Sequence, residues 1–451
     1  MENGHAQKDS FNNSLRYRIN AEKIRKNILF QKLKDILFLF VIVFAPPIIP
    51  YPHLFLAIYS LLKMKIYYRR LRIRVLRYSG QWKLIEAMIV LAVYALIIII
   101  INEFAFSETV NTSHYVSLFN RFSVLLVAAV PCYTLYILEA EKKGRTCFDF
   151  VEHIVGAGLL QTMLVFASFL SDNIHQIFVS WMYRMTGNSW FENSWLVLVR
   201  SYGFAGTFVD LFGMGMGLIA GVSLLYGFYN KKKYIFYSFL IAIAGTINAR
   251  TTVVIYVISV FFTFICFSLK EKLGAIVIAL FAISIIVLSW DSLIAFMETV
   301  NRANFSWIFS GYRALLQLIR GGELGDVFPT LFSESFWQIP QGFQLIFGSG
   351  HSLYGADGYR HSDVGYINDL WFVGTVGVLW LYGNIASIIV KWCKRENNPF
   401  IRNVILFLSC SALVFNIKGS LIGYNPGAST LFGIIFILSY YARSKVRKEC
   451  N

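Results

Sequence analysis

Runs of apolar residues, separated by polar, basic or glycine-rich stretches, recur along the whole chain. Many runs approach the roughly twenty residues that a helix needs to cross the hydrocarbon core of a bilayer. We place the apolar segments at 36–49, 52–62, 84–101, 117–138, 151–170, 204–229, 234–248, 252–269, 274–290, 366–391, 400–417 and 426–442. This pattern predicts an all-α polytopic integral membrane protein with about twelve transmembrane helices.

The first two segments are short and flank the sequence "APPIIPYP", whose prolines interrupt a helix. They form either a pair of short helices or one broken span. If both cross, the total is twelve, and both ends of the chain lie on the same side of the membrane.

The segments divide the chain into five parts. We expect a basic cytoplasmic tail over 1–35, transmembrane helices 1–9 over 36–290, a large extracytoplasmic loop over 291–365, transmembrane helices 10–12 over 366–442, and a second cytoplasmic tail over 443–451. The first tail lacks the apolar core and cleavage site of a signal peptide. Within the large loop, apolar residues recur at three- to four-residue spacing over 302–320, which predicts a helix.

The composition agrees with a membrane protein, because 57% of the residues are hydrophobic and only 15% are charged. A soluble domain carries about a quarter charged residues. The formal net charge of +16 does not indicate nucleic acid as a partner. Instead, 32 of the 41 lysine and arginine residues fall in alternate loops, which the positive-inside rule assigns to the cytoplasm.

The face predicted to lie outward is nearly free of lysine but retains arginine. The basic residues outside the cytoplasmic pieces are Arg121, Arg184, Arg200, Arg250, Arg302, Arg313, Arg320, Arg360 and Lys418. Guanidinium suits phosphate and pyrophosphate better than ammonium does, because its planar fork binds two oxygens at once. No cysteine falls in a predicted outward loop, so we expect no disulfide framework, and no residue spacing predicts a metal or cofactor site.

Arg250 lies in "TINARTTVV", a connector so short that the flanking apolar segments must form a tight hairpin. A charge at membrane depth costs at least about 2.5–3.5 kcal/mol and normally faces a cavity or a partner. Arg250 therefore either extends to the lipid headgroups or binds an anion inside the bundle. Arg200 stands just before the sixth segment, and Asp210 lies about two turns deeper. Gly213, Gly217 and Gly221 follow a spacing that allows close helix packing.

Three arginines of the large loop share one helix face if the predicted helix continues through Gly311. Arg302, Arg313 and Arg320 are separated by eleven and seven residues, both close to whole turns. Like charges on one face repel each other unless an anion or acidic groups compensate. This face is either solvated above the lipid headgroups or a clamp for phosphate or pyrophosphate.

Ionisable residues gather at the start of the tenth segment, in "YRHSDVGYINDLWFVGTVG", which includes Arg360, His361, Asp363 and Asp369. Either His361 or Asp363 has the chemistry of a general base toward a hydroxyl group. The alternative is that Asp363 caps the following helix by accepting hydrogen bonds from its first backbone N–H groups.

Four sequence pieces, in this order along the chain, resemble bacterial oligosaccharide-repeat polymerases of the Wzy type, within the wider O-antigen ligase and polymerase superfamily. The pieces are "RSYGF" at the sixth segment, "NARTTVV" between two segments, "FSGYRALL" followed by "LIFGSG", and "HSDVGYINDLWFVGTVG". Together they cover roughly residues 196–383.

The resemblance implies a glycosyltransferase on the outer face of the bacterial inner membrane. Such enzymes join repeat units carried on undecaprenyl diphosphate, without a metal, cofactor or nucleotide sugar, and a chain-length regulator is an implied partner. By matching motifs, Arg200, Arg250 and Arg313 would bind the diphosphate, with Arg313 also acting in catalysis, and Arg302 and Arg320 are further diphosphate candidates.

One motif departs from the ligase branch of that superfamily. The ligases have a histidine eleven residues before the first glycine of "GxxG", whereas here Gly374 and Gly377 place Asp363 in that slot, with His361 two residues earlier. We expect Asp363 to act as the base with His361 assisting. The alternatives are an O-antigen ligase that transfers glycan to a lipid core and, in a different class, a flippase of lipid-linked oligosaccharide. Most predicted spans carry no charge, which favours an enzyme over a flippase.

Overall fold

In the computed structural model of this chain, helices account for most of the described residues, and none of these residues forms a β-strand. The residues described are 26–50, 52–67, 75, 81–105, 129–186, 200–206, 209–266, 337–350, 362, 364–396, 398–419 and 426–449. A helix over 26–44 comes first. The later helices are α2 (Pro52–Tyr67), α4 (Gln81–Ala105), α6 (Val130–Lys142), α7 (Cys147–Leu170), α8 (Asp172–Thr186), α11 (Val209–Tyr229), α12 (Lys233–Asn248), α13 (Thr251–Cys266), α18 (Phe343–Phe347), α19 (Gly365–Arg395), α20 (Pro399–Phe415) and α21 (Pro426–Glu449).

The described parts of the predicted apolar segments are mostly helical, while the segment 274–290 lies outside the described residues. By length and apolar composition, four helices are able to cross a membrane: Ile85–Phe104, Cys147–Leu170, Leu211–Tyr229 and Gly365–Lys394. Shorter apolar helices cover Thr251–Cys266, Pro399–Phe415 and Thr430–Tyr441. These helices support a helical membrane protein, and the count of twelve crossings stays a prediction.

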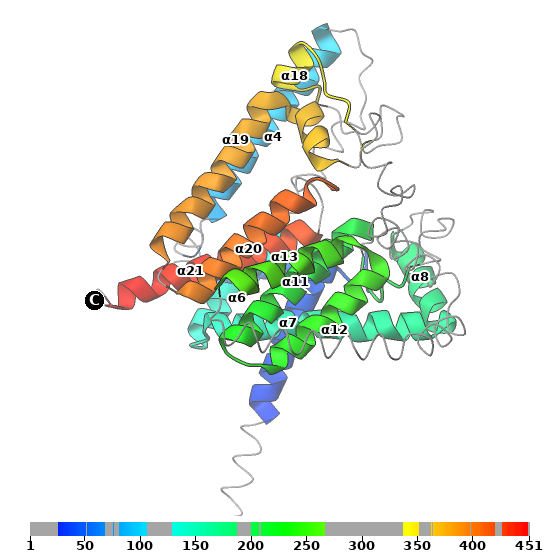
Figure 1. The fold of residues 1–451 in the computed structure, drawn as a ribbon, viewed down its shortest axis with the longest axis vertical. Helices are drawn as coiled ribbons and strands as arrows, with labels where there is room; N and C mark the ends of the chain where they lie inside the picture. The colour runs from blue at the N-terminus through cyan, green and yellow to red at the C-terminus, as the bar shows by residue number, and fades with distance from the viewer. Residues whose placement is uncertain are drawn as a thin grey trace, which may run out of the picture.

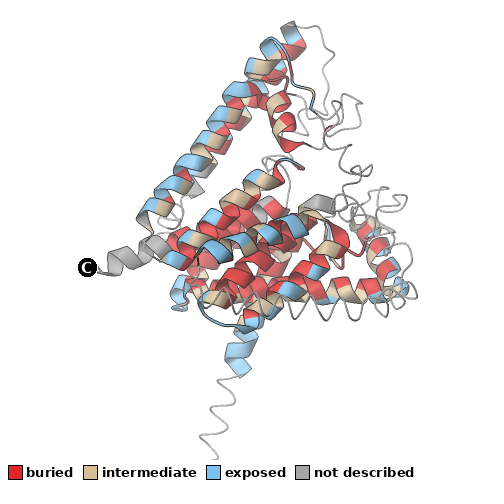
Figure 2. Cartoon of the chain, viewed as in Figure 1, coloured by how far each residue is buried: buried red, intermediate tan, exposed pale blue. Residues whose placement is uncertain are grey.

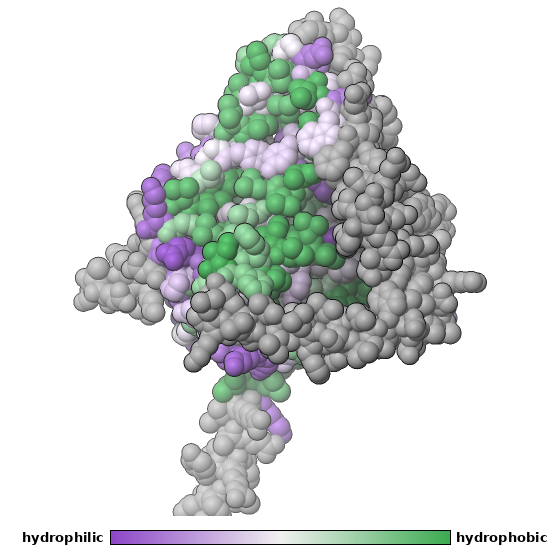
Figure 3. Space-filling view, in the orientation of Figure 1, coloured by the Kyte–Doolittle hydropathy of each residue, from purple (hydrophilic) through white to green (hydrophobic). Residues whose placement is uncertain are grey.

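Helix α11 is the centre of a helical bundle from which α4 and α19 lean away as a two-helix arm (Figure 1). It contacts α7, α12, α13, α20 and α21. Within its apolar stretch 89% of the residues are buried, against 28% for α19. Burial therefore concentrates in the bundle, and the arm is largely exposed (Figure 2). On the face seen in Figure 3, apolar side chains cover much of the described surface of both parts.

The small residues of α11 allow this close packing. A Cβ atom at Gly213 would lie 2.5 Å from the Cβ of Ala249, and one at Gly221 would lie 2.2 Å from the Phe407 ring. A Cβ atom at Gly217 would meet Ile255 at 3.0 Å. The prediction that these glycines serve helix packing is confirmed.

The proline-rich stretch after the first helix joins two separate helices. The first helix ends at residue 44, Ala45 has a positive φ of 44°, and α2 begins at Pro52. Asp35 on the first helix pairs with Arg145, which lies in the turn between α6 and α7. Lys63 on α2 pairs with Glu139, which lies in the last turn of α6, close to that turn. Because both partners lie at one end of the bundle, the chain runs outward and back. The two segments are therefore a pair of helices and not one broken span.

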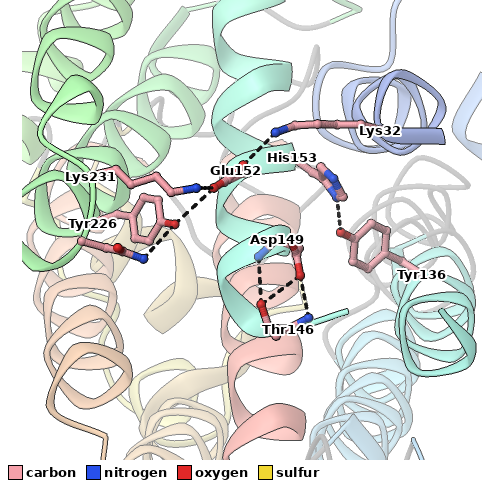
Figure 4. A network of polar contacts seen from close by, with 9 residues as sticks. Lys32, Tyr136, Thr146, Asp149, Glu152, His153, Tyr226 and Lys231 are labelled. Carbon is pink, nitrogen blue, oxygen red and sulfur yellow. Dashed lines mark hydrogen bonds and ion pairs between the residues drawn. The ribbon is translucent and has the colours of Figure 1, made fainter. Parts of the chain in front are cut away.

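Acidic side chains join several basic pieces at this end of the bundle, which we term the charged end. Glu152 on α7 accepts hydrogen bonds from Lys231 and from Lys32, the latter at 2.7 Å, and from the Tyr226 hydroxyl at 3.3 Å (Figure 4). Lys143 lies 3.8 Å from an oxygen of Asp35. Four of the stretches predicted to be cytoplasmic from their lysine and arginine content therefore meet here. Which face of the membrane they occupy stays a prediction.

We expect Glu152→Gln to lower the stability of the protein by about 1 kcal/mol, because two partly exposed lysines lose their shared carboxylate. Lys32 and Lys231 are 41% and 46% exposed, which limits the effect. Thermal unfolding in detergent measures the change. Lys232→Gln is the control, since Lys232 lies in the same turn but makes no ion pair among the described residues. Equal losses for the two variants would contradict this role of Glu152.

Candidate functional site

The end of the bundle opposite the charged end carries buried polar side chains, and we term it the polar end. Helix α20 starts at the charged end, where Phe400 packs against Phe148 and Tyr229 with ring centroids 5.7 and 5.1 Å apart. Its last turn and the following Asn416 therefore lie at the polar end. Because α11 ends at Tyr229, the start of α11 lies at the polar end as well.

Arg200 opens a short non-helical segment over 200–206 that leads into α11. Gln161 of α7 donates a hydrogen bond to the Tyr202 carbonyl at 2.6 Å, and the Gly206 N–H donates to the Phe44 carbonyl at 2.9 Å. Gly203 has φ +60°, and a Cβ atom there would lie 2.9 Å from the backbone nitrogen of Val165. These contacts fix the segment against α7 and the end of the first helix. Arg200 is buried, with 8% of its surface exposed.

Helix α8 packs over this segment and runs across the end of α7 (Figure 1). The Phe204 ring lies 5.3 Å from that of Phe178 and 5.2 Å from that of Trp181. His175, also on α8, is hydrogen-bonded to Ser168 at 3.0 Å. Helix α8 lies between the predicted apolar segments 151–170 and 204–229, where the apolar pattern predicted no helix. It encloses the side of the polar end on which Arg200 lies.

Arg250 stands in a two-residue connector between α12 and α13, which confirms the predicted tight hairpin. The Thr252 hydroxyl donates a hydrogen bond to the Gly213 carbonyl at 3.0 Å, and Gly213 packs directly on Ala249. The connector is thereby held against the second turn of α11. The half-buried Arg250 and the buried Arg200 thus come from distant parts of the chain to the same end of α11. The N-terminal end of this helix adds partial positive charge there.

The start of α19 docks on the end of α20. The Tyr366 N–H donates a hydrogen bond to the Asn416 carbonyl at 3.2 Å, and a Cβ atom at Gly365 would lie 2.4 Å from the Gly419 carbonyl oxygen. Asn368 donates to the Ser362 carbonyl at 2.7 Å. The N-cap residue of α19 is Val364, which makes no side-chain capping bond. Asp363 lies outside the described residues, so its role as a general base and its alternative role as a helix cap both stay predictions.

A buried carboxylate, Asp369, lies just beyond this docking point. It is fully buried and accepts hydrogen bonds from the Tyr382 hydroxyl at 2.7 Å and from the Asn416 side chain at 3.3 Å. Asn416 also donates to the Tyr382 hydroxyl. Asp369 lies at the start of the predicted tenth segment, and the sequence predicted no role for it. The signal was an acidic residue inside an apolar run, which normally has a partner.

We expect Tyr382→Phe to destabilise the protein by about 1–3 kcal/mol, because the buried carboxylate of Asp369 loses a donor that nothing replaces. Tyr366→Phe is the matched control, since its hydroxyl bonds the Leu413 carbonyl at 2.8 Å in an exposed setting. Thermal unfolding in detergent compares the two variants. An equal loss for both would show that the Asp369 contact has no special weight.

The segment after α18 inserts into a break in α19. Gly374 interrupts α19 with φ 63° and ψ −177°, which leaves carbonyls of the preceding turn without their helical partners. The Ser349 N–H donates to the Trp371 carbonyl at 2.7 Å, and the Gly350 N–H donates to the Phe372 carbonyl at 3.0 Å. The sequence "LIFGSG" therefore supplies the missing donors for the broken helix.

Helix α4 holds the inserted segment from the other side. The Tyr94 hydroxyl donates to the Phe347 carbonyl at 2.9 Å, and Asn102 donates to the Ser349 carbonyl at 2.9 Å. The Trp371 indole N–H bonds the Gln338 carbonyl at 2.7 Å. The "LIFGSG" part of the third sequence piece is thus in direct contact with the tenth-segment piece.

The structure places two of the predicted site residues, Arg200 and Arg250, and it brings both to the start of α11. The remaining predicted residues, His361, Asp363, Arg302, Arg313 and Arg320, lie outside the described residues. The described part of the polar end therefore offers arginines beside α11 and a buried carboxylate beside α20. Chemically, such a site is suited to holding an anionic group at the edge of an apolar bundle.

No protein-family model and no curated protein matches this chain.

Proposed function

We propose that this chain is a glycosyltransferase that polymerises oligosaccharide repeat units carried on undecaprenyl diphosphate into a surface polysaccharide. The observation that carries the proposal is the convergence of Arg200 and Arg250 at the start of α11, in a bundle that is otherwise apolar. A diphosphate attached to a lipid is an anion that must be held at the membrane surface. Guanidinium groups at the end of an apolar bundle match both properties.

The proposed reaction transfers the growing glycan from one lipid carrier to the next repeat unit. An acceptor sugar hydroxyl oxygen forms a bond to the anomeric carbon of the donor glycan. The bond between that carbon and the diphosphate oxygen breaks, and its electron pair leaves with the lipid diphosphate. The hydroxyl proton passes to Asp363 or His361. Preorganised cations stabilise the charge that develops on the leaving diphosphate, a role for Arg200, Arg250 and Arg313.

The location proposed for this reaction is the outer face of the bacterial inner membrane. Lysine and arginine together mark alternate loops as cytoplasmic, and four of those pieces meet at the charged end. The polar end would then face outward, where the lipid-linked repeat units are joined. A polysaccharide chain-length regulator is the proposed protein partner.

A ligase of the same superfamily is the second candidate, because it uses the same lipid-diphosphate donor and releases the same lipid diphosphate as leaving group. The two differ in the acceptor, which is another repeat unit for the polymerase and a lipid core for the ligase. Asp363 in place of the ligase histidine favours the polymerase. A flippase would carry cations along a central path, whereas α11, at the centre of the bundle, contains no basic residue.

The length distribution of surface polysaccharide tests the proposal. In a deletion strain we expect the ladder to collapse to one attached repeat and to be restored by the wild-type chain but not by Arg313→Ala. Long polymer that remains on its lipid carrier would indicate a ligase. Repeat units trapped on the cytoplasmic face would indicate a flippase.

Purified protein provides the direct assay. With lipid-diphosphate repeat units as the sole substrate, we expect polymer to form. One undecaprenyl diphosphate should be released for each glycosidic bond made between repeat units. Absence of both products from a folded protein, under conditions where the deletion strain is complemented, would overturn the proposal that this chain alone performs the transfer.

A further inference from the structure

A groove of about 450 Å³ lies between α7, α12 and α13, on the side of the bundle next to the Arg250 connector. Its floor is one face of α12, where Phe239, Ala242, Ile243, Thr246 and Ile247 follow a helical spacing. From the first to the last of these residues the floor is roughly 12 Å long, at 1.5 Å per residue.

The walls of the groove are apolar and partly aromatic. Phe166 and Phe169 of α7 form one wall, and Val253 and Tyr256 of α13 form the other. At the inner end, the Tyr256 hydroxyl is hydrogen-bonded to Ser238 at 3.1 Å. This bond uses the polar atom of Tyr256, so its ring presents apolar surface to the groove.

The connector that carries Arg250 lies at the outer end of the groove. Ile247 and Val253 both line it, and each is three residues away from Arg250 in the connector between them. The groove is therefore an apolar channel that ends beside a connector carrying an arginine. An apolar channel favours a hydrocarbon chain as ligand, and an arginine near its end favours an anionic head group on that chain.

We propose that this groove binds the polyprenyl chain of the lipid diphosphate, with the diphosphate at the Arg250 end. The inference rests on the proposed function and assigns to it the part of the substrate that the polymerase does not alter. A methyl-branched chain is broad enough to contact both aromatic walls. Ala242 contributes only a methyl group to the middle of the floor, so a larger side chain at this position would extend into the groove.

Filling the groove is the test, with native mass spectrometry of the purified chain in detergent as the readout. The probes are undecaprenyl diphosphate, undecaprenol and phosphatidylglycerol. We expect Ala242→Phe to weaken undecaprenyl diphosphate binding at least tenfold, and Ile243→Trp to do the same from an exposed position if the first variant folds poorly. Ile97→Trp, on the exposed face of α4, is the matched control and should bind like the wild type.

The outcomes separate a specific site from ordinary lipid contact. Loss of undecaprenyl diphosphate in the groove variants, with undecaprenol binding more weakly than the diphosphate in the wild type, supports the assignment. Phosphatidylglycerol binding equally well, or undecaprenyl diphosphate binding unchanged by Ala242→Phe and Ile243→Trp, overturns it.

Failure of this inference and failure of the proposed function are distinguishable. If the groove variants polymerise repeat units with an unchanged KM, the groove assignment fails and the polymerase proposal stands. If the wild type binds undecaprenyl diphosphate in the groove but releases none from repeat units, the polymerase proposal fails and the binding site stands as that of a lipid-diphosphate protein.

Discussion

Replacing Arg250 by alanine is expected to reduce polymerisation by roughly 100-fold or more, the loss typical of removing one preorganised group that stabilises developing negative charge. Arg250 lies in a connector held against α11 by the bond between Thr252 and the Gly213 carbonyl, so its backbone stays in place when the side chain is removed. The loss should therefore appear in turnover and in diphosphate binding, with little change in stability. The assay is the rate of undecaprenyl diphosphate release from lipid-linked repeat units.

Two further variants separate a specific site from general positive charge. Arg250→Lys retains the charge but loses the planar fork, so we expect it to recover only part of the activity. Arg184→Ala removes another arginine of the predicted outward face, one that is exposed on α8, and should leave the rate near that of the wild type. If Arg184→Ala and Arg250→Ala reduce the rate equally, the proposed diphosphate role of Arg250 is wrong.

Gly374→Ala is expected to produce the largest loss of stability, roughly 2–6 kcal/mol, from backbone strain and overpacking together. Gly374 has φ 63° and ψ −177°, a region that residues other than glycine rarely enter. A Cβ atom there would lie 2.3 Å from the Gly348 nitrogen and 2.5 Å from the Ile346 carbonyl oxygen. The inserted segment would have to separate from α19.

Gly383→Ala is the control on the same helix. Gly383 is exposed, and a Cβ atom there meets nothing within 4 Å, so the substitution should stabilise the helix by about 0.5–1 kcal/mol. Thermal unfolding in detergent gives both values. If Gly374→Ala unfolds at the wild-type temperature, the break in α19 does not depend on glycine.

The sequence pattern predicted the helices well because crossing a bilayer imposes length and apolarity on each one. The proline-interrupted start, the hairpin at Arg250 and the packing glycines of α11 were likewise predictable, because each depends on local residue types. Helix α8 was not predicted. Its sequence mixes polar and apolar residues at helical spacing, so its mean hydropathy is lower than that of a span, and its packing on Phe204 depends on tertiary structure.

The candidate site was predictable in part. Arg250 stood out because charges at membrane depth are rare, and Arg200 because it is one of the few arginines outside the predicted cytoplasmic pieces. The partnership of Asp369 with Tyr382 and Asn416 was not predictable, since the latter two are ordinary polar residues 13 and 47 positions further along the chain. Contact between Gly348 and Gly374 was hidden for the same reason. Pairings between different helices, or across the break at Gly374 within α19, leave no periodic signal in a sequence.

The shared carboxylate at the charged end has a consequence for how the protein is made. Glu152 follows its first partner, Lys32, by 120 residues, but precedes its second partner, Lys231, by 79. At a synthesis rate of 5–20 residues per second, about 4–16 seconds separate the emergence of Glu152 from that of Lys231. During this interval Lys32 is the only one of the two lysine partners that is available to Glu152. Lys231, in the turn between α11 and α12, therefore joins Glu152 after Lys32 has become available to it. This sets an order in which the contacts of Glu152 form during synthesis.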